Sequence, residues 1–94
     1  MHYVYIIYSA TIKKYYIGET KDLSLRLVWH NTKEFKASYT SKVSDWEVFF
    51  AIECVDIVQA RKIEKHIKSM KSRTYIENLK KHKEISQKLL EKYS

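Results

Sequence analysis

The chain has 94 residues, of which 45% are hydrophobic and 14% aromatic, and its formal net charge is +7. It contains one glycine, no proline and one cysteine, Cys54, which excludes collagen-like, low-complexity and linker-rich chains, an internal disulfide and a structural zinc site. This size predicts a single domain, residues 1–94, with one modest core.

The sequence contains no signal for a membrane or for export. No apolar run approaches the ~20 residues of a membrane span. The first residues lack the basic start and the cleavage site of a signal peptide. Since a lone cysteine suits a reducing compartment, we expect a cytoplasmic protein.

The positive charge is concentrated in the last third of the chain. Residues 1–60 contain seven lysines and arginines and seven acidic residues, whereas residues 61–94 contain eleven and four. A basic helical segment indicates a polyanionic partner, most simply nucleic acid. A lysine-rich solvated surface explains the same numbers, so charge alone leaves both interpretations open.

The chain begins with a predicted β-hairpin. Residues 3–9 are almost all apolar or aromatic, as in a strand that is covered on both faces. Residues 10–13 form a short connection, and residues 14–19 pair back. If the connection has an even number of residues, Tyr5 and Tyr16 lie on the same face of the sheet.

The first helix is predicted from Asp22 to Asn31. Asp22 is a typical N-cap, and Leu23 and Leu27 lie four residues apart on one face. Arg26 and His30 flank this apolar stripe, so both point toward the body of the protein. One explanation is stem burial with the polar tip in water, and the other is a functional site.

A polar, partly mobile loop is expected over residues 32–45, where no period is visible. The next nine residues, 46–54, alternate between two faces and predict a third strand. One face carries Trp46, Val48, Phe50 and Ile52, and the other carries Glu47, Phe49, Ala51 and Glu53.

The second helix opens with Asp56 and Gln59, which resemble a capping box. Its apolar stripe consists of Ile57, Ala60, Ile63, Ile67 and Met70. Glu64 falls inside this stripe, whereas Lys62 and Lys65 point away. A carboxylate on the core side is costly unless it forms a salt bridge or coordinates a cation. Both roles are open for Glu64.

A further helical start is expected at Thr74, with Glu77 completing a second capping box. The apolar residues that follow predict one or two C-terminal helices, with His82 at the join. The predicted fold is therefore α+β, with a three-stranded antiparallel sheet flanked by helices in the order β-β-α-β-α-α.

At this point the residues match a known family, because the chain resembles the GIY-YIG nuclease domain. The matching residues occur in order over residues 3 to about 80: Tyr3-Val4-Tyr5, Tyr16-Ile17-Gly18, Asp22-Leu23, Arg26-Leu27, His30-Asn31, Tyr39-Thr40, Ala60, Glu64, Ile67 and Lys68. Tyr3 replaces the glycine of the first tripeptide, and the loop lacks the usual glycines and prolines. The resemblance is to small stand-alone bacterial members, related to the incision subunit of excision repair. It leaves residues 81–94 as a basic helical extension.

This resemblance implies phosphodiester hydrolysis with one divalent cation, Mg²⁺ or Mn²⁺. It implies that Glu64 holds the metal and that Arg26 contacts the scissile phosphate. Tyr5 would deprotonate or orient the attacking water, with Tyr16 and His30 as helpers; which of the three takes the proton stays open. DNA repair in a bacterial cytoplasm would be the setting.

Three functions are consistent with these residues. The first is a metal-dependent DNA endonuclease, directed by DNA structure, because the chain has no room for a separate recognition domain. The second is a non-catalytic or partner-dependent nucleic-acid-binding module, and the third is an interaction domain for an acidic protein. A specificity-conferring protein partner fits the first two. The candidate nucleic-acid contacts are Lys36, Tyr39, Lys42, Lys68, Lys71, Arg73 and Asn78.

Overall fold

The computed structural model describes residues 1–32 and 39–94, and for Tyr39 and Ser41 it describes the backbone alone. Its elements are, in order, β1 (His2–Ser9), β2 (Lys14–Thr20), α1 (Leu23–Asn31), the 3₁₀ turn η1 (Tyr39–Lys42), β3 (Glu47–Cys54), α2 (Ile57–Met70), α3 (Arg73–Lys81) and α4 (Lys83–Lys92). The predicted α+β fold is confirmed, and the C-terminal part consists of two helices that meet at His82.

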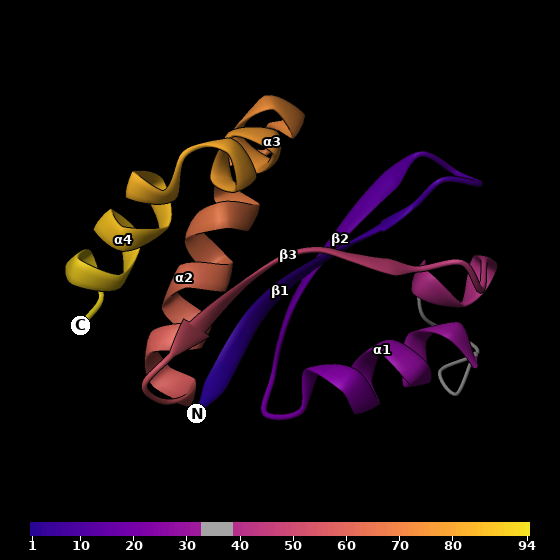
Figure 1. Cartoon of the computed structure of the whole chain (residues 1–94), viewed down its shortest axis with the longest axis horizontal. Coiled ribbons are helices and arrows are strands. Elements are labelled where there is room, and N and C mark those ends of the chain that lie inside the picture. Colours follow the sequence, from indigo (N-terminus) through magenta and orange to yellow (C-terminus); the bar gives the residue numbers. More distant parts are fainter. Residues whose placement is uncertain (33–38) are drawn as a thin grey trace.

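The sheet is antiparallel with the strand order β2-β1-β3, so β1 is central and β2 is an edge strand (Figure 1). In the β1–β2 ladder Tyr5 pairs with Gly18 and Ile7 pairs with Tyr16. The connection over residues 10–13 has four residues, an even number, which is the condition for Tyr5 and Tyr16 to lie on one face. Tyr5 and Tyr16 share one face, as predicted.

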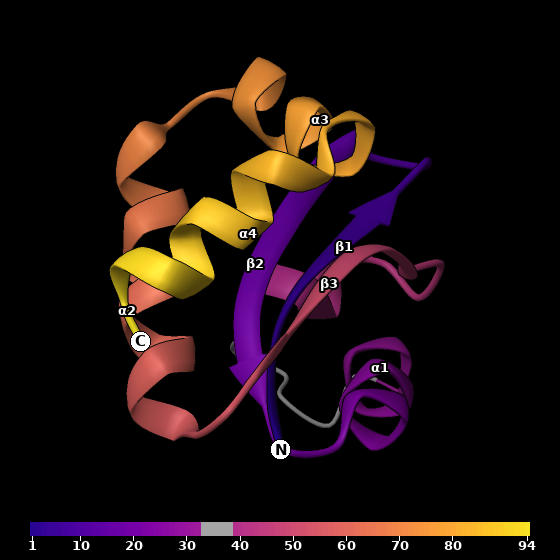
Figure 2. The same cartoon turned by 60° about the vertical axis from the view of Figure 1, so that its left-hand side comes forward.

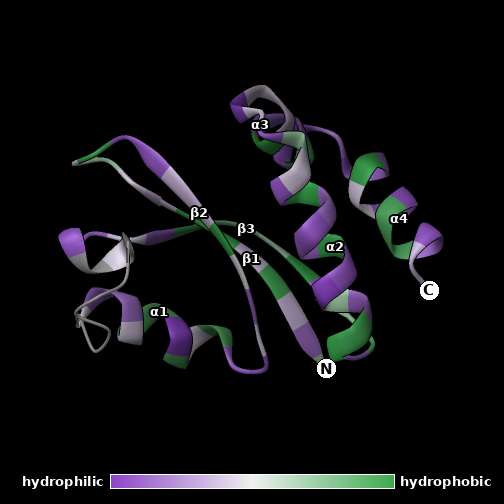
Figure 3. Cartoon of the chain, turned by 180° about the vertical axis from the view of Figure 1, so that it is seen from behind, coloured by the Kyte–Doolittle hydropathy of each residue, from purple (hydrophilic) through white to green (hydrophobic). Residues whose placement is uncertain are grey.

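Helices cover both faces of the sheet, with α1 on one side and α2, α3 and α4 on the other (Figure 2). Hydrophobic residues (green) lie along the strands in the middle of the molecule (Figure 3). The α2 side contains the larger core: Val4, Ile6, Ile52, Cys54, Ala60, Ile63, Ile67, Ile76, Leu79 and Leu89. The α1 side contains the smaller one: Tyr5, Ile7, Val43 and Trp46.

The predicted alternation along β3 is wrong. The β1–β3 register shifts between Ile6 and Ile7, so that Ile6 pairs with Phe50 while Ile7 pairs with Val48. Phe49 is the inserted residue of a bulge, and a bulge reverses the face that later residues present. Consequently Phe49 and Phe50 both pack against the larger core, whereas Trp46 belongs to the smaller one.

Two of the three predicted helix caps are confirmed. The Asp22 carboxylate accepts from the Leu25 N–H, and the Asp56 carboxylate accepts from the Gln59 N–H. Gln59 reaches back one residue beyond the usual capping box and accepts from the Val55 N–H. The third expected start, at Thr74, is wrong, because Ser72 accepts from the Tyr75 N–H and begins α3 two residues earlier.

The segment after α1 was expected to be loop. Within it, residues 39–42 form η1, and Thr40 and Val43 are buried. The Trp46 indole donates to the Thr40 carbonyl, and the Asn31 amide bonds both backbone groups of Trp46. The end of α1 is thus fixed to the start of β3. Lys33 and Lys36 lie outside the described residues.

Helix α4 packs against α2. Leu89 is buried in the larger core, the Gln59 amide donates to the Leu90 carbonyl, and His66 bonds the Tyr93 hydroxyl at 2.8 Å. Every helix in residues 1–32 and 39–94 is too short or too polar to cross a bilayer.

Candidate active site

A chain of three buried side chains lies between the sheet and α1. The Tyr5 hydroxyl is 2.8 Å from His30 Nε2, and His30 Nδ1 is 2.7 Å from the Thr40 hydroxyl. The exposed fractions of the three are 2%, 5% and 1%. If Tyr5 donates to Nε2, the imidazole carries its proton on Nδ1 and donates it to Thr40. Each polar atom of the imidazole is then satisfied.

Local structure explains why these groups meet. His30 lies in the last turn of α1, on the face that the Leu23 and Leu27 stripe turns toward the sheet. Gly18 lies opposite Tyr5 in the ladder and leaves room for the Tyr5 ring. Tyr16 is half-buried, and its ring lies edge-on to His30, with the centroids 5.2 Å apart.

The environment keeps both rings neutral. Burial raises the pKa of Tyr5 far above its ordinary value of 10.0, and Tyr16 and the carboxylates of Glu64 and Glu19 add to this, whereas Arg26 opposes it. Burial lowers the pKa of His30, and the nearby Arg26 charge lowers it further. Near neutral pH, Tyr5 is therefore a proton donor and His30 is a proton acceptor.

Arg26 lies one turn before His30 on α1 and is half-buried, in a groove that also includes the end of β2. Its guanidinium lies 4.3 Å from the centre of the Trp29 ring. No ion pair of the described residues involves it. An accessible guanidinium suits a phosphate, because its planar fork matches two oxygens of the anion.

Glu64 approaches from the other face of the sheet, on α2. Its side chain is 18% exposed, and Oε2 lies 2.7 Å from the Lys68 ammonium, one turn later. Its negative charge contributes to the raised pKa of Tyr5. The salt bridge expected for Glu64 is thus present, and an exposed lysine can give up its place to a metal cation.

The edge strand β2 lies between these two halves. At its end Glu19 Oε2 lies 3.3 Å from His2 Nε2 and 3.5 Å from the Arg61 guanidinium Nε. The His2 contact has ion-pair distance without hydrogen-bond geometry. Since Arg61 is one turn before Glu64, this network ties α2 to β2 beside the candidate site.

The donor set determines what kind of metal site fits here. Residues 1–32 and 39–94 contain no group of three or more histidines, cysteines or carboxylates that could hold a metal. A hard cation such as Mg²⁺ accepts a single carboxylate when waters and phosphate oxygens fill its other positions. The partly exposed Glu64 carboxylate fits such a site.

Three predicted nucleic-acid contacts lie together at the start of β2. Lys68, Lys71 and Arg73 line one pocket of about 250 Å³ together with Lys13 and Lys14. Lys13 and Lys71 are the two non-glycine residues with positive φ in the described part of the chain, at 53° and 46°. Such backbone is costly for a lysine, and strained residues of this kind cluster at functional sites.

The other predicted contacts are not grouped with these. Lys42 is exposed at the end of η1, and Asn78 is half-buried on α3, where no hydrogen bond of the described residues joins its side chain to another candidate. The backbone of Tyr39 belongs to η1, and its side chain is outside the description, as is all of Lys36.

Sequence reasoning about sites missed Thr40, Glu19, Lys13 and Lys14. Thr40 lies in a segment without a period, and only the Tyr39-Thr40 pair of the resemblance marks it. Glu19 lies on the face of β2 that is turned toward α2. Charged residues are common on edge strands, so the sequence gives no reason to single it out. Lys13 and Lys14 look like ordinary turn residues until β2 and α2 are seen side by side.

Comparison with known proteins identifies a family for this chain. The model of the GIY-YIG catalytic domain matches residues 1–83 of the 94-residue chain. No curated protein and no solved structure gave a match. The matched domain is a nuclease domain, and its substrate is nucleic acid. The chain therefore belongs to the GIY-YIG family of nucleases.

Proposed function

We propose that this protein is a metal-dependent DNA endonuclease that selects its substrate by DNA structure. The observation that carries the proposal is the Tyr5–His30–Thr40 chain, which lies within electrostatic reach of Arg26 and Glu64. Together these groups supply a proton acceptor, a phosphate-binding cation and a metal-binding carboxylate.

His30 is the final proton acceptor in this proposal. Its neutral Nε2 is the basic atom of the chain near neutral pH, and Thr40 fixes its tautomer. Tyr5 donates to Nε2, so it relays the proton: it gives its hydroxyl proton to Nε2 as it takes one from the attacking water, and with its raised pKa it stays neutral. The half-buried Tyr16 lies beside this pair and helps to orient the attacking water toward the Tyr5 hydroxyl.

Arg26 binds the non-bridging oxygens of the scissile phosphate, where negative charge grows in the transition state. Glu64 would hold a single Mg²⁺ or Mn²⁺, and the chemistry supplied there would be polarisation of the phosphate and a lower pKa of bound water. Bound phosphate also brings negative charge near His30, which raises its pKa again and strengthens it as a base.

The DNA path follows β2. The basic pocket of Lys13, Lys14, Lys68, Lys71 and Arg73 lies at the beginning of this strand, and Arg26 lies near its end. Cations on a backbone path hold phosphates but read no bases, so they favour selection by structure. A protein partner that adds specificity, and a role in DNA repair in a bacterial cytoplasm, belong to the same proposal.

The test is cleavage of labelled single-stranded, duplex, flap and four-way-junction DNA with Mg²⁺, Mn²⁺ or EDTA. Wild type is compared with Glu64→Gln and with Glu53→Gln, which removes an exposed carboxylate on β3. We expect metal-dependent cutting by wild type and Glu53→Gln, and none by Glu64→Gln. Equal salt-sensitive binding by all three without cutting would instead establish the binding module.

A further inference from the structure

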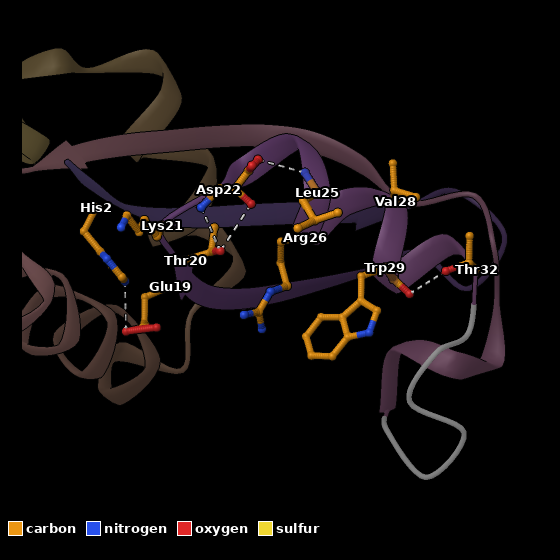
Figure 4. Close-up of a pocket in the computed structure, with 10 residues that line it drawn as sticks. All are labelled: His2, Glu19, Thr20, Lys21, Asp22, Leu25, Arg26, Val28, Trp29 and Thr32. Atoms are coloured by element: carbon orange, nitrogen blue, oxygen red, sulfur yellow. Dashed lines mark hydrogen bonds and ion pairs between the residues drawn. The ribbon is translucent and has the colours of Figure 1, made fainter.

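A groove of about 680 Å³ runs along α1 from the end of β2. It begins near His2 and Glu19 and continues to Thr32 (Figure 4). Its α1 wall is unusually apolar for a helix surface. Leu25 is 66% exposed and Val28 is 56% exposed, and both line the groove. Neither Leu25 nor Val28 belongs to the apolar stripe of Leu23 and Leu27 that packs toward the sheet.

The groove also contains an aromatic ring and a cation that lie together. Arg26 and Trp29 project from α1 in the same direction, and the guanidinium lies over the indole at 4.3 Å from its centre (Figure 4). The same Arg26 is the phosphate-binding candidate. The groove is therefore continuous with the candidate active site.

The charges in the groove favour an anionic occupant. Arg26 and Lys21 form no ion pair with any described residue. The two acidic residues of the lining are already engaged, because Asp22 caps α1 and Glu19 pairs with His2 and Arg61. An apolar wall, a large aromatic ring and free cations together match a nucleotide, which has a flat base and an anionic phosphate.

We propose that this groove binds an unpaired nucleotide next to the phosphate that Arg26 contacts, with its base against Trp29. The inference rests on the proposed function and specifies which class of DNA the nuclease takes as its substrate. A base inside a duplex has both faces covered by its neighbours, so only an unpaired base can reach the indole. The substrate class is then DNA with a single-stranded segment at the cleavage point, such as a flap.

The experiment measures binding in EDTA, so its result is independent of cleavage. A fluorescent single-stranded oligonucleotide is compared with a series in which one position at a time is abasic, which removes a base but keeps every phosphate. Affinities are measured by anisotropy for wild type, Trp29→Leu and Trp29→Phe. Val58→Ala is the matched control, since Val58 is an exposed apolar residue on α2, outside the groove.

We expect one abasic position to weaken binding to wild type and to Val58→Ala by about tenfold, as for the loss of a base–aromatic stack. Trp29→Leu should bind intact DNA about as weakly as wild type binds the abasic DNA, and should not respond to that abasic position. Trp29→Phe should recover part of the loss. The abasic series changes only the DNA. It therefore tests the inference with wild type even if a Trp29 variant fails to fold.

Two results would overturn the inference, and they are distinguishable. If wild type binds and cuts DNA but tolerates every abasic position, the groove takes no base and is free to serve a protein partner, while the proposed function stands. If wild type neither binds nor cuts any of the DNAs, the proposed function fails together with the inference.

Discussion

The ring of Tyr5 lies directly against Gly18, the residue that it faces in the β1–β2 ladder. A Cβ added to Gly18 would stand 2.5 Å from the Tyr5 hydroxyl oxygen and 2.6 Å from the carbon that bears it. Real Cβ atoms do not approach so closely, and the Tyr5 ring is packed on its other sides. The single glycine of the chain thus permits the tyrosine position that reaches His30.

Gly18→Ala should therefore displace Tyr5 and break its hydrogen bond to His30. We expect the free energy of unfolding to fall by about 1–3 kcal/mol, as for other overpacked sites. Cleavage activity should fall as well. Chemical denaturation and single-turnover cleavage measure the two effects.

The backbone at Gly18 is not left-handed, so alanine is excluded only by the ring. In a Tyr5→Ala background the same Gly18→Ala change should cost little stability, because the clash is gone. A cost that stays the same in both backgrounds would show that the ring is not the cause.

The lowered pKa of His30 gives the stability a pH dependence. Above pH 6.5 the imidazole is neutral in both the folded and the unfolded chain, so its contribution is complete. As the pH falls below this value, the unfolded chain takes up the proton first, and the free energy of unfolding decreases until the folded-state pKa is reached. His30→Gln should remove this part of the pH profile.

The measurement is urea unfolding between pH 4.5 and 7.5, in steps of about 0.5, for wild type and His30→Gln. His82→Gln is the control, because that histidine is exposed at the join of α3 and α4. An unchanged profile in His30→Gln, or an equal change in His82→Gln, would contradict the assignment to His30.

Local rules predicted much of this fold. The first hairpin, the Asp22 and Asp56 caps and the shared face of Tyr5 and Tyr16 follow from short-range patterns. The bulge at Phe49 could not be predicted in this way. The sequence around it reads as an ordinary alternating strand, and only the pairing with β1 shows that one residue is inserted. Ser72 and Thr74 are both good caps, and tertiary packing decides between them.

The Glu64–Lys68 ion pair must open before Glu64 can hold a metal. Lys68→Met should therefore tighten Mn²⁺ binding by about two- to tenfold, since it removes a competing and repelling charge. Titration calorimetry without DNA measures this directly. Lys65→Met, which removes an exposed lysine from the same helix, should have little effect. Equal Mn²⁺ affinities in wild type and Lys68→Met would contradict the ion-pair argument.

Lys71 ends α2 in left-handed backbone, where glycine is normally preferred. Lys71→Gly should change stability by no more than about 1 kcal/mol, and in the stabilising direction if relief of strain outweighs the flexibility of glycine. DNA binding should nevertheless weaken, and the slope of log K against log salt should fall by about 0.9 if Lys71 contacts one phosphate of a duplex. Binding is measured between 50 and 200 mM salt, the range over which such contacts lose roughly 10³–10⁵ in affinity for six to ten phosphates.

Lys62→Ala is the matched control for Lys71→Gly. It removes one positive charge from the exposed side of α2, outside the basic pocket. The net charge of the two variants is the same, so a difference in salt slope reports position alone. Identical slopes would remove Lys71 from the DNA interface.

The candidate site was predictable only in part. Helical spacing drew attention to Arg26, His30 and Glu64 as polar residues on inward faces. In the structure His30 bonds the Tyr5 hydroxyl, and the charges of Arg26 and Glu64 act on the pKa of Tyr5. Spacing could not show that Lys68 neutralises Glu64, because four residues apart on a helix is also the distance of an ordinary surface pair. Spacing could not identify the role of Thr40 either, since its hydrogen bond to His30 depends on how η1 packs on α1.

The most direct test is the single-turnover cleavage rate of His30→Gln, Glu64→Gln and the double variant, on the DNA that wild type cuts best. His30 and Glu64 lie on helices that cover opposite faces of the sheet, and the proposed function requires both in one active site. We expect each single variant to lose at least about a hundredfold, and the double variant to be little slower than the worse single one. A rate within about twofold of wild type in either single variant would contradict the account.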